Sequence, residues 1–207
     1  MASTAKRLLA AMNYWRTFIV YLCVLCSPHK DLIRADVARW NDIHQFRFGM
    51  FESLNWYMTY NKEFRNLLLH RLKNPTRSLL AMGQYLIARI FWKPLETLYI
   101  YTEDIGGGLY IQHGFSTIIT AKKIGKNCRI YQQVTIGYRN GENPPVLEDN
   151  VSVTCGAKVL GDITMHTGSL AAAGAVVVKD VPENAIVAGV PAKIIGYKDE
   201  NNLDFQG

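Results

Sequence analysis

Histidines and cysteines are the residues of this 207-residue chain that most readily do chemistry. Two of its five histidines, His113 and His166, stand in the glycine-rich C-terminal half. An unperturbed imidazole has a pKa of about 6.5, so either ring can accept a proton from a hydroxyl group near neutral pH. A lone histidine on a surface is usually only a solvated side chain. Whether each histidine is a catalytic base or only a solvated side chain therefore depends on the secondary-structure elements that position its ring.

The four cysteines indicate neither a metal site nor a redox site. Cys23 and Cys26 form a CxxC pair, but the pair lies inside the apolar run 18–26, and no second pair completes a zinc site. A thioredoxin-like role requires a βαβ context, whereas the surrounding sequence is helical. We interpret all four, including Cys128 and Cys155, as reduced and mostly buried thiols of a cytoplasmic protein.

The composition is that of an ordinary globular protein, with 49% hydrophobic and 19% charged residues. Disorder, collagen and coiled coil are excluded as the main class. The net charge of +6 is compatible with a nucleic acid, a membrane surface or a phosphate-bearing ligand. Because no run of four basic residues occurs, no nucleic-acid partner is expected. The apolar run 18–26 is shorter than the ~20 residues that span a bilayer, and no cleavage pattern follows it, so neither a transmembrane segment nor export is expected.

The sequence changes character near residue 95, which separates a predicted α-helical domain (1–95) from the rest. Residues 5–92 hold only two of the sixteen glycines, and hydrophobic residues recur three and four positions apart. This spacing predicts about four helices, at roughly 5–26, 30–44, 48–72 and 76–92.

Beyond residue 95 an aliphatic residue recurs nearly every six positions. Nine of the eleven intervals are six residues long, and the other two are seven and eleven. The positions are Ile105, Ile111, Ile118, Ile124, Ile130, Ile136, Leu147, Val153, Val159, Met165, Ala171 and Val177. Period six is typical of a parallel β-helix, in which three hexapeptides close one triangular coil. The twelve repeats predict about four coils.

The expected fold class is therefore α+β, an N-terminal helical region followed by a left-handed parallel β-helix at 96–198. We expect a flexible tail at 199–207, which resembles a protease-cleavage scar and is left out of the fold prediction.

This array, together with Ile111-Gln112-His113-Gly114 and the ending Val187-Ala-Gly-Val-Pro-Ala-Lys193-Ile-Ile-Gly, resembles the hexapeptide-repeat acyltransferases. Because a helical half precedes the array, the chain is most similar to the bacterial serine O-acetyltransferases. The resemblance implies acetyl-coenzyme A as acyl donor, no metal and a cytoplasmic enzyme of cysteine biosynthesis. It also implies a homotrimer, or a dimer of trimers joined through the helical half, with active sites in grooves between neighbouring prisms.

The resemblance implies that His113 is the catalytic general base and that the amide of Cys155 stabilises the oxyanion. Counting hexapeptides places His113, Cys155 and Ala173 in one vertical column, with His113 about 10 Å below Cys155. The small residues at 155 and 173 would leave room for the pantetheine arm. Lys179 and Lys193 would then meet the phosphates of coenzyme A.

Three positions depart from the serine enzymes. Gln112 replaces an aspartate beside the histidine, Asn143 replaces a second histidine in the loop 138–146, and Leu98 replaces an aspartate that orients the imidazole. Arg139 could still hold a carboxylate, and Glu142 an ammonium, so L-serine is the first expected acceptor. A sugar hydroxyl is the alternative acceptor for the same machinery.

Two other classes remain open. A γ-type carbonic anhydrase uses the same fold but needs three zinc-binding histidines, whereas the array holds only His113 and His166. A non-catalytic scaffold would not bind coenzyme A at all.

Overall fold

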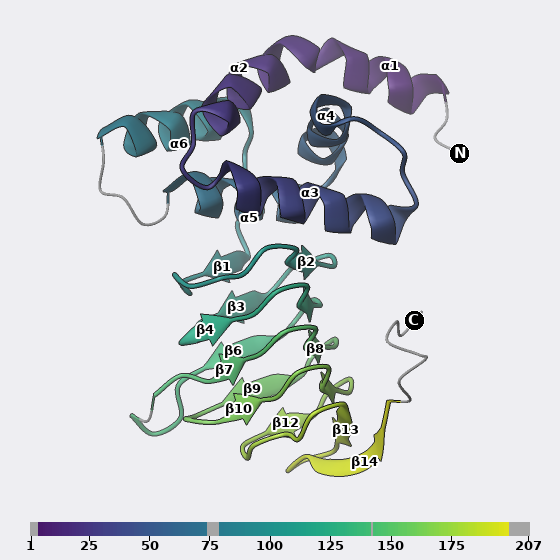
Figure 1. Cartoon of the computed structure of the whole chain (residues 1–207), viewed down its shortest axis with the longest axis vertical. Coiled ribbons are helices and arrows are strands. Elements are labelled where there is room, and N and C mark those ends of the chain that lie inside the picture. The colour runs from purple at the N-terminus through teal and green to yellow at the C-terminus, as the bar shows by residue number, and fades with distance from the viewer. Residues whose placement is uncertain (1–3, 74–78, 142, 199–207) are drawn as a thin grey trace. The chain divides into compact units, whose positions relative to one another are not determined.

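The computed structural model describes residues 4–73, 79–141 and 143–198 (Figure 1). The chain forms two compact units, Met1–Glu96 and Thr97–Gly207, of which the first is helical and the second is built from short strands. The helices are α1 (Thr4–Met12), α2 (Tyr14–Leu25), α3 (Lys30–His44), α4 (Met50–Tyr60), α5 (Lys62–Lys73) and α6 (Leu79–Phe91).

The prediction of one continuous helix at 5–26 is wrong. The segment forms two helices, α1 and α2, which meet at Asn13 with a bend of 60°. The Asn13 side-chain amide donates a hydrogen bond to the carbonyl oxygen of Leu9 at 3.3 Å and accepts one from Arg16 at 3.1 Å. A short polar side chain that bonds nearby groups in this way competes with the regular helix. Hydrophobic spacing is the same on both sides of the bend and does not reveal it.

The predicted helix at 48–72 is also divided, into α4 and α5. Asn61 between them is extended, with φ −115° and ψ 98°. The guanidinium of Arg65 donates to the carbonyl oxygens of Met58 and Thr59 at 2.6 and 2.8 Å. These carbonyls at the end of α4 therefore have side-chain partners in place of the next helical turn.

Aromatic rings and one ion pair hold the helical unit together. The ring of Trp40 on α3 lies 5.3 Å from that of Tyr57 on α4 and 5.0 Å from that of Phe64 on α5, and all three side chains are buried. Asp36 and Arg71 form a buried two-point ion pair between α3 and α5, with N–O distances of 2.9 and 3.2 Å.

The second unit is a left-handed parallel β-helix with three walls, as predicted. Its strands are β1 (Leu98–Ile100), β2 (Tyr110–Ile111), β3 (Thr117–Ile119), β4 (Lys123–Ile124), β5 (Arg129–Ile130), β6 (Thr135–Gly137), β7 (Val146–Leu147), β8 (Ser152–Val153), β9 (Lys158–Leu160), β10 (Thr164–Met165), β11 (Leu170–Ala171), β12 (Val176–Val177), β13 (Ala185–Ala188) and β14 (Lys193–Tyr197). We name the walls by their first strands. The β1 wall is β1-β3-β6-β9-β12, the β2 wall is β2-β5-β8-β11-β13 with β14 antiparallel at its end, and the β4 wall is β4-β7-β10.

The stack has about five coils, so the predicted number of about four is too low. The β1 wall and the β2 wall each have five parallel strands, and isolated bridges at Ile105 and Val181 extend the β4 wall at both ends. The aliphatic series continues past Val177 to Val181 and Val187, which are buried. The predicted series of repeats ended at Val177, one coil before the β-helix ends.

One predicted core position is also wrong, and the error marks an irregular corner. Ile118 is 41% exposed, whereas Ile119 is fully buried and pairs with the core residue of the next coil. Eight positions therefore separate the core residues Ile111 and Ile119, two more than the regular six. The longer corner contains His113 and Ser116, both with positive φ (63° and 52°).

Candidate active site

The corners that join the β2 wall to the β1 wall form one edge of the prism, which we call the His113 edge. On it the strand register aligns four residues of successive coils: His113, Gln132, Cys155 and Ala173. Each stands two residues after a core residue that is paired with its counterpart in the next coil. His113 and Cys155 are two coils apart, or about 10 Å at the usual strand spacing.

His113 presents its side chain to solvent from the irregular corner. The N–H of Gly114 donates to the carbonyl oxygen of Gln112 at 2.7 Å, which closes a tight turn around the histidine. Gln112 is half-buried, and its N–H donates to Ile130 of the next coil at 2.9 Å. No described residue forms a hydrogen bond with the His113 ring, so the part of this chain that the structure covers provides no carboxylate to orient it.

Cys155 and Ala173 form the upper part of the same column. Cys155 is a half-buried free thiol, and its carbonyl oxygen accepts from the N–H of Gly174 at 2.9 Å. Its own N–H donates to no residue that the structure describes, and an unused N–H is the kind of donor that an oxyanion requires. Gly156 and Gly174 adopt positive φ (71° and 69°), a conformation that glycine takes without the strain that a side chain would cause.

Gln132 occupies the position between His113 and Cys155, and sequence reasoning missed it. Its Oε1 atom is buried and has no hydrogen-bond partner among the described residues. A buried acceptor without a partner is costly, so this atom is suited to receive a donor from a ligand. The hexapeptide count that links His113 to Cys155 passes through Gln132 and could have identified it.

The loop 138–146 stands on a different edge, where the β1 wall meets the β4 wall. Arg139 is exposed, and the Asn143 side-chain amide donates to Asp162 at 3.2 Å. Glu142 lies outside the described residues. The β-helix of one chain therefore does not bring Arg139 and Asn143 onto the edge that carries His113.

The two predicted phosphate ligands lie near the last coil and are both exposed. Lys179 follows β12 on the same edge as the loop 138–146, whereas Lys193 begins β14 at the end of the β2 wall. Each can meet an anion from solvent, but they lie on separate parts of the prism. One chain thus carries the predicted site residues on two separate edges, with Lys193 apart from them at the end of the β2 wall.

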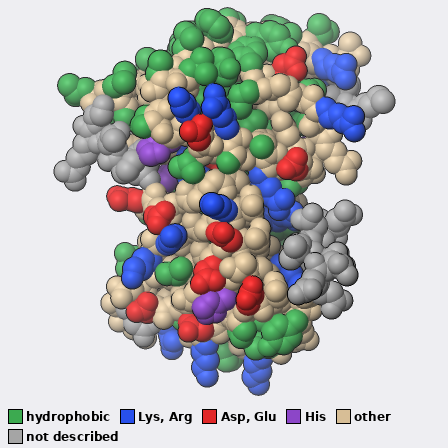
Figure 2. Space-filling model, in the orientation of Figure 1, with side chains coloured by type: hydrophobic (Ala, Val, Ile, Leu, Met, Phe, Trp, Pro, Cys, Tyr) green, Lys and Arg blue, Asp and Glu red, His purple; other side chains and the backbone are tan. Residues whose placement is uncertain are grey.

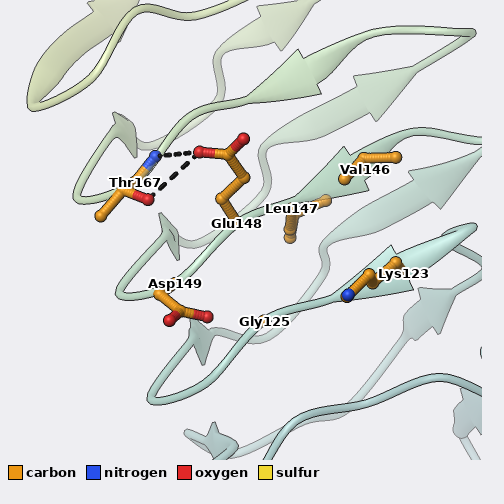
Figure 3. A pocket seen from close by; sticks show the side chains of 7 residues that line it. All are labelled: Lys123, Gly125, Val146, Leu147, Glu148, Asp149 and Thr167. Atoms are coloured by element: carbon orange, nitrogen blue, oxygen red, sulfur yellow. Dashed lines mark hydrogen bonds between the residues drawn. The ribbon is translucent and has the colours of Figure 1, made fainter.

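A hollow of about 360 Å³ lies on the β4 wall, where residues of β4 and β7 and of the corners that follow the strands of this wall line it (Figure 3). Glu148 Oε2 accepts from the Thr167 N–H at 2.9 Å and from its hydroxyl at 3.1 Å, and Oε1 lies 3.2 Å from His166 Nδ1. These hydrogen bonds lower the pKa of Glu148, and the bond from the Thr167 backbone N–H has the largest effect. The carboxylate thus stabilises a corner between coils, and none of the predicted site residues lines the hollow.

Within residues 4–73, 79–141 and 143–198, no three His, Cys, Asp or Glu side chains are grouped as they would be to hold a metal ion.

No model of a protein family matches the sequence, but individual proteins do. A serine acetyltransferase of Staphylococcus aureus strain Mu50 is 32% identical over 149 residues, which are 70% of this chain and 68% of that protein. A serine acetyltransferase of Bacillus licheniformis is 38% identical over 109 residues, or 49% of this chain and 50% of that protein. The chain spans about half the length of the first curated relatives that it matches.

Solved structures share this fold, in which helices are followed in the sequence by a β-helix. The serine acetyltransferase of Brucella abortus strain S19 has a TM-score of 0.60 and 26% identity, covering 86% of this chain and 73% of that chain. A serine acetyltransferase in complex with CoA (TM-score 0.58, 24% identity, 86% of this chain and 74% of that chain) has the same fold. The Neisseria gonorrhoeae serine acetyltransferase in complex with serine (TM-score 0.60, 23% identity, 95% and 85%) does as well.

Proposed function

Because the chain belongs to the serine acetyltransferases, a family of hexapeptide-repeat enzymes, we propose that it transfers the acetyl group of acetyl-coenzyme A to the hydroxyl of L-serine. The observation that carries this proposal is the column on the His113 edge. At successive coils it combines an exposed imidazole with an amide oxygen and a backbone N–H that have no hydrogen-bond partner among the described residues. Relatives whose structures contain CoA or serine support the donor and the acceptor.

The proposed reaction begins at His113. Its imidazole takes the proton of the serine hydroxyl while the oxygen attacks the thioester carbonyl carbon. The carbonyl oxygen becomes an oxyanion, which accepts a hydrogen bond from the N–H of Cys155. Collapse of the tetrahedral intermediate breaks the carbon–sulfur bond. The thiolate of coenzyme A then takes the proton from the imidazolium, which leaves O-acetylserine and free coenzyme A.

The remaining site residues have binding roles in this proposal. Cys155 and Ala173 line the path of the pantetheine arm, and Lys179 and Lys193 meet the phosphates of coenzyme A. Gln112, Arg139, Glu142 and Asn143 hold the polar groups of the acceptor. Gln132 adds a hydrogen-bond acceptor between the base and the oxyanion site.

We propose a homotrimer, alone or as a dimer of trimers, and the separation of the site residues onto different edges supports an active site shared between subunits. His113 and Arg139 lie on different edges of one prism, and a groove between neighbouring prisms would combine one edge from each subunit. The four cysteines are free thiols, which supports a reducing, cytoplasmic location.

The test is release of coenzyme A thiol by the purified full chain with L-serine, with a panel of hexoses and aminosugars, and without acceptor. His113→Ala should reduce serine-dependent turnover about 10²–10⁴-fold, because it removes the general base. His166→Ala is the matched control and should retain activity, since His166 bonds to Glu148 on another edge. Full turnover by folded His113→Ala protein would refute the mechanism. Preference for a sugar would refute L-serine as the acceptor but would leave the proposed mechanism of acetyl transfer intact.

A further inference from the structure

Two adjacent helices of the helical unit expose an apolar surface. We define this apolar helical surface by Trp15, Phe18 and Leu22 of α2 and Leu79, Leu86 and Ile90 of α6, all exposed. The helices are neighbours, because the rings of Trp15 and Phe91 lie 5.7 Å apart and the Arg16 guanidinium donates to the carbonyl oxygen of Phe91. Hydrophobic side chains cover the upper part of the helical unit in Figure 2, which agrees with this assignment.

Helix α6 is apolar on both of its faces. Ala81 and Ala88 face the core of the unit and are buried, as in any packed helix. On the opposite face Leu79, Leu86 and Ile90 are 92%, 49% and 75% exposed. A helix on the surface of a globular protein normally carries polar residues there. An exposed apolar face of this extent, continued on α2, indicates a surface that binds something.

The helices α1, α2 and α6 themselves carry charged side chains of one sign only. Helices α1, α2 and α6 contain no Asp or Glu, but they contain Lys6, Arg7, Arg16 and Arg89. Residues 1–96 hold 14 Lys and Arg against 6 Asp and Glu, a formal net charge of +8. Residues 97–207 hold 9 against 11, a net charge of −2. The basic excess of the chain therefore belongs to the helical unit.

These charges favour an anionic lipid surface over a second copy of the chain as the occupant. Two copies that met through this surface would bring their basic residues together, whereas an anionic bilayer would be attracted to them. A helix that lies in a membrane interface typically combines Trp, Phe and Leu on one side with Lys and Arg at the border. Trp15 and Phe18, with the exposed Lys6 and Arg7 on α1, match that description.

The helices are suited to lie on the membrane plane. In the described part of the chain no single helix is long and apolar enough to cross a bilayer, and α1 and α2 reach that length only as a pair bent by 60°. We propose that the helical unit binds the surface of an anionic membrane through the apolar helical surface, with its basic residues against the lipid head groups. This inference is independent of the proposed acetyl transfer.

The test is cosedimentation of the full chain with phosphatidylcholine vesicles, with and without phosphatidylglycerol. We expect binding to the anionic vesicles that weakens as salt is added. The variant Lys6→Gln/Arg7→Gln should lower the partition coefficient roughly fivefold for each charge removed. Its matched control, Lys122→Gln/Lys123→Gln, removes two exposed charges from the β-helix and should bind as well as the unaltered chain.

The apolar contribution has its own variant, Leu22→Gln/Leu86→Gln/Ile90→Gln, which should lose most of the vesicle binding. Ile195→Gln, at an exposed apolar position of β14, is its control. Circular dichroism verifies that the helices persist in the triple variant. If this variant unfolds, the vesicle binding of Lys6→Gln/Arg7→Gln decides the test. Equal binding to both vesicle types, or none to either, overturns the proposal. So does a triple variant that binds vesicles normally but sediments at a lower mass, which would identify a contact between copies of the chain.

Discussion

At the scale of single residues, the His113 edge shows how an ordinary amide becomes a candidate for function. Gln132 is chemically unremarkable, but it stands one coil from His113 and one from Cys155 and has a buried oxygen without a partner among the described residues. Its neighbour Gln133 is exposed and belongs to the same corner. The two glutamines therefore form a natural pair for comparison.

We predict that Gln132→Asn lowers kcat/KM for acetyl transfer about tenfold or more, because shortening the side chain withdraws its amide from the groove by more than 1 Å. The same chemical change at Gln133, which Asn tolerates at φ 60°, should have little effect. Steady-state kinetics with both substrates measures the difference. Equal kinetics for the two variants would remove Gln132 from the site.

At the scale of elements, the ion pair between α3 and α5 contrasts with one on the surface. Asp36 and Arg71 are both almost fully buried, whereas Asp31 and Arg34, 3.1 Å apart on α3, are both exposed. Removing one partner of a buried pair leaves an uncompensated charge in the core. An exposed pair leaves a charge that water solvates.

Asp36→Ala should reduce the free energy of unfolding of the helical unit by about 3–5 kcal/mol. Asp31→Ala, the same substitution on the same helix, should cost less than about 1 kcal/mol. Urea titrations followed by circular dichroism at 222 nm compare the two. A loss of similar size in both variants would contradict this account.

The end of α3 also predicts a pH dependence. His44 packs against the rings of Trp40, Phe46 and Tyr57, and burial lowers its pKa below the ordinary value. The folded unit therefore prefers the neutral imidazole. This contribution to stability is complete above the pKa of the unfolded chain, about 6.5, and is lost as the pH falls from there through the lower pKa of the folded state.

We accordingly expect the melting temperature of the helical unit to fall by a few degrees between pH 7.5 and pH 5. His44→Gln removes the titrating group and should flatten that part of the profile, although it lowers stability at neutral pH. Thermal melts at a series of pH values give both curves. An unaltered slope in the variant would assign the pH dependence to another group.

At the scale of the whole molecule, the separation of His113 and Arg139 onto two edges gives the trimer proposal a direct test. If each groove takes its base from one subunit and its loop from the next, two inactive variants can repair one another. Co-refolded His113→Ala and Arg139→Ala chains should regain part of the activity that each lacks alone. His113→Ala mixed with Gln132→Asn should not, because both residues belong to one edge.

Sedimentation should accompany that experiment and show particles of about 70 kDa or twice that mass, since one chain is 23.4 kDa. A fully active particle of monomer mass would contradict the shared groove.

The sequence alone was sufficient for the architecture of the β-helix, for a physical reason. Every coil must fill the same narrow interior, so an aliphatic residue has to return at nearly constant spacing, and that period is visible without coordinates. The same period relates residues one above another, which is why His113, Cys155 and Ala173 could be aligned by counting. The helical half was visible for a similar reason, since its hydrophobic residues recur with the period of a helix.

The tertiary structure decided what depends on contacts between distant residues. The breaks at Asn13 and Asn61 rest on hydrogen bonds that periodicity does not record, and the longer corner at His113 exchanged Ile118 for Ile119 in the core. His113 and Arg139 lie on different edges because their corners join different pairs of walls. The corner of His113 joins the β2 wall to the β1 wall, whereas that of Arg139 joins the β1 wall to the β4 wall. Whether a leucine on α6 faces a core or solvent depends on which neighbours cover it, and only the folded chain shows that Leu86 is left exposed.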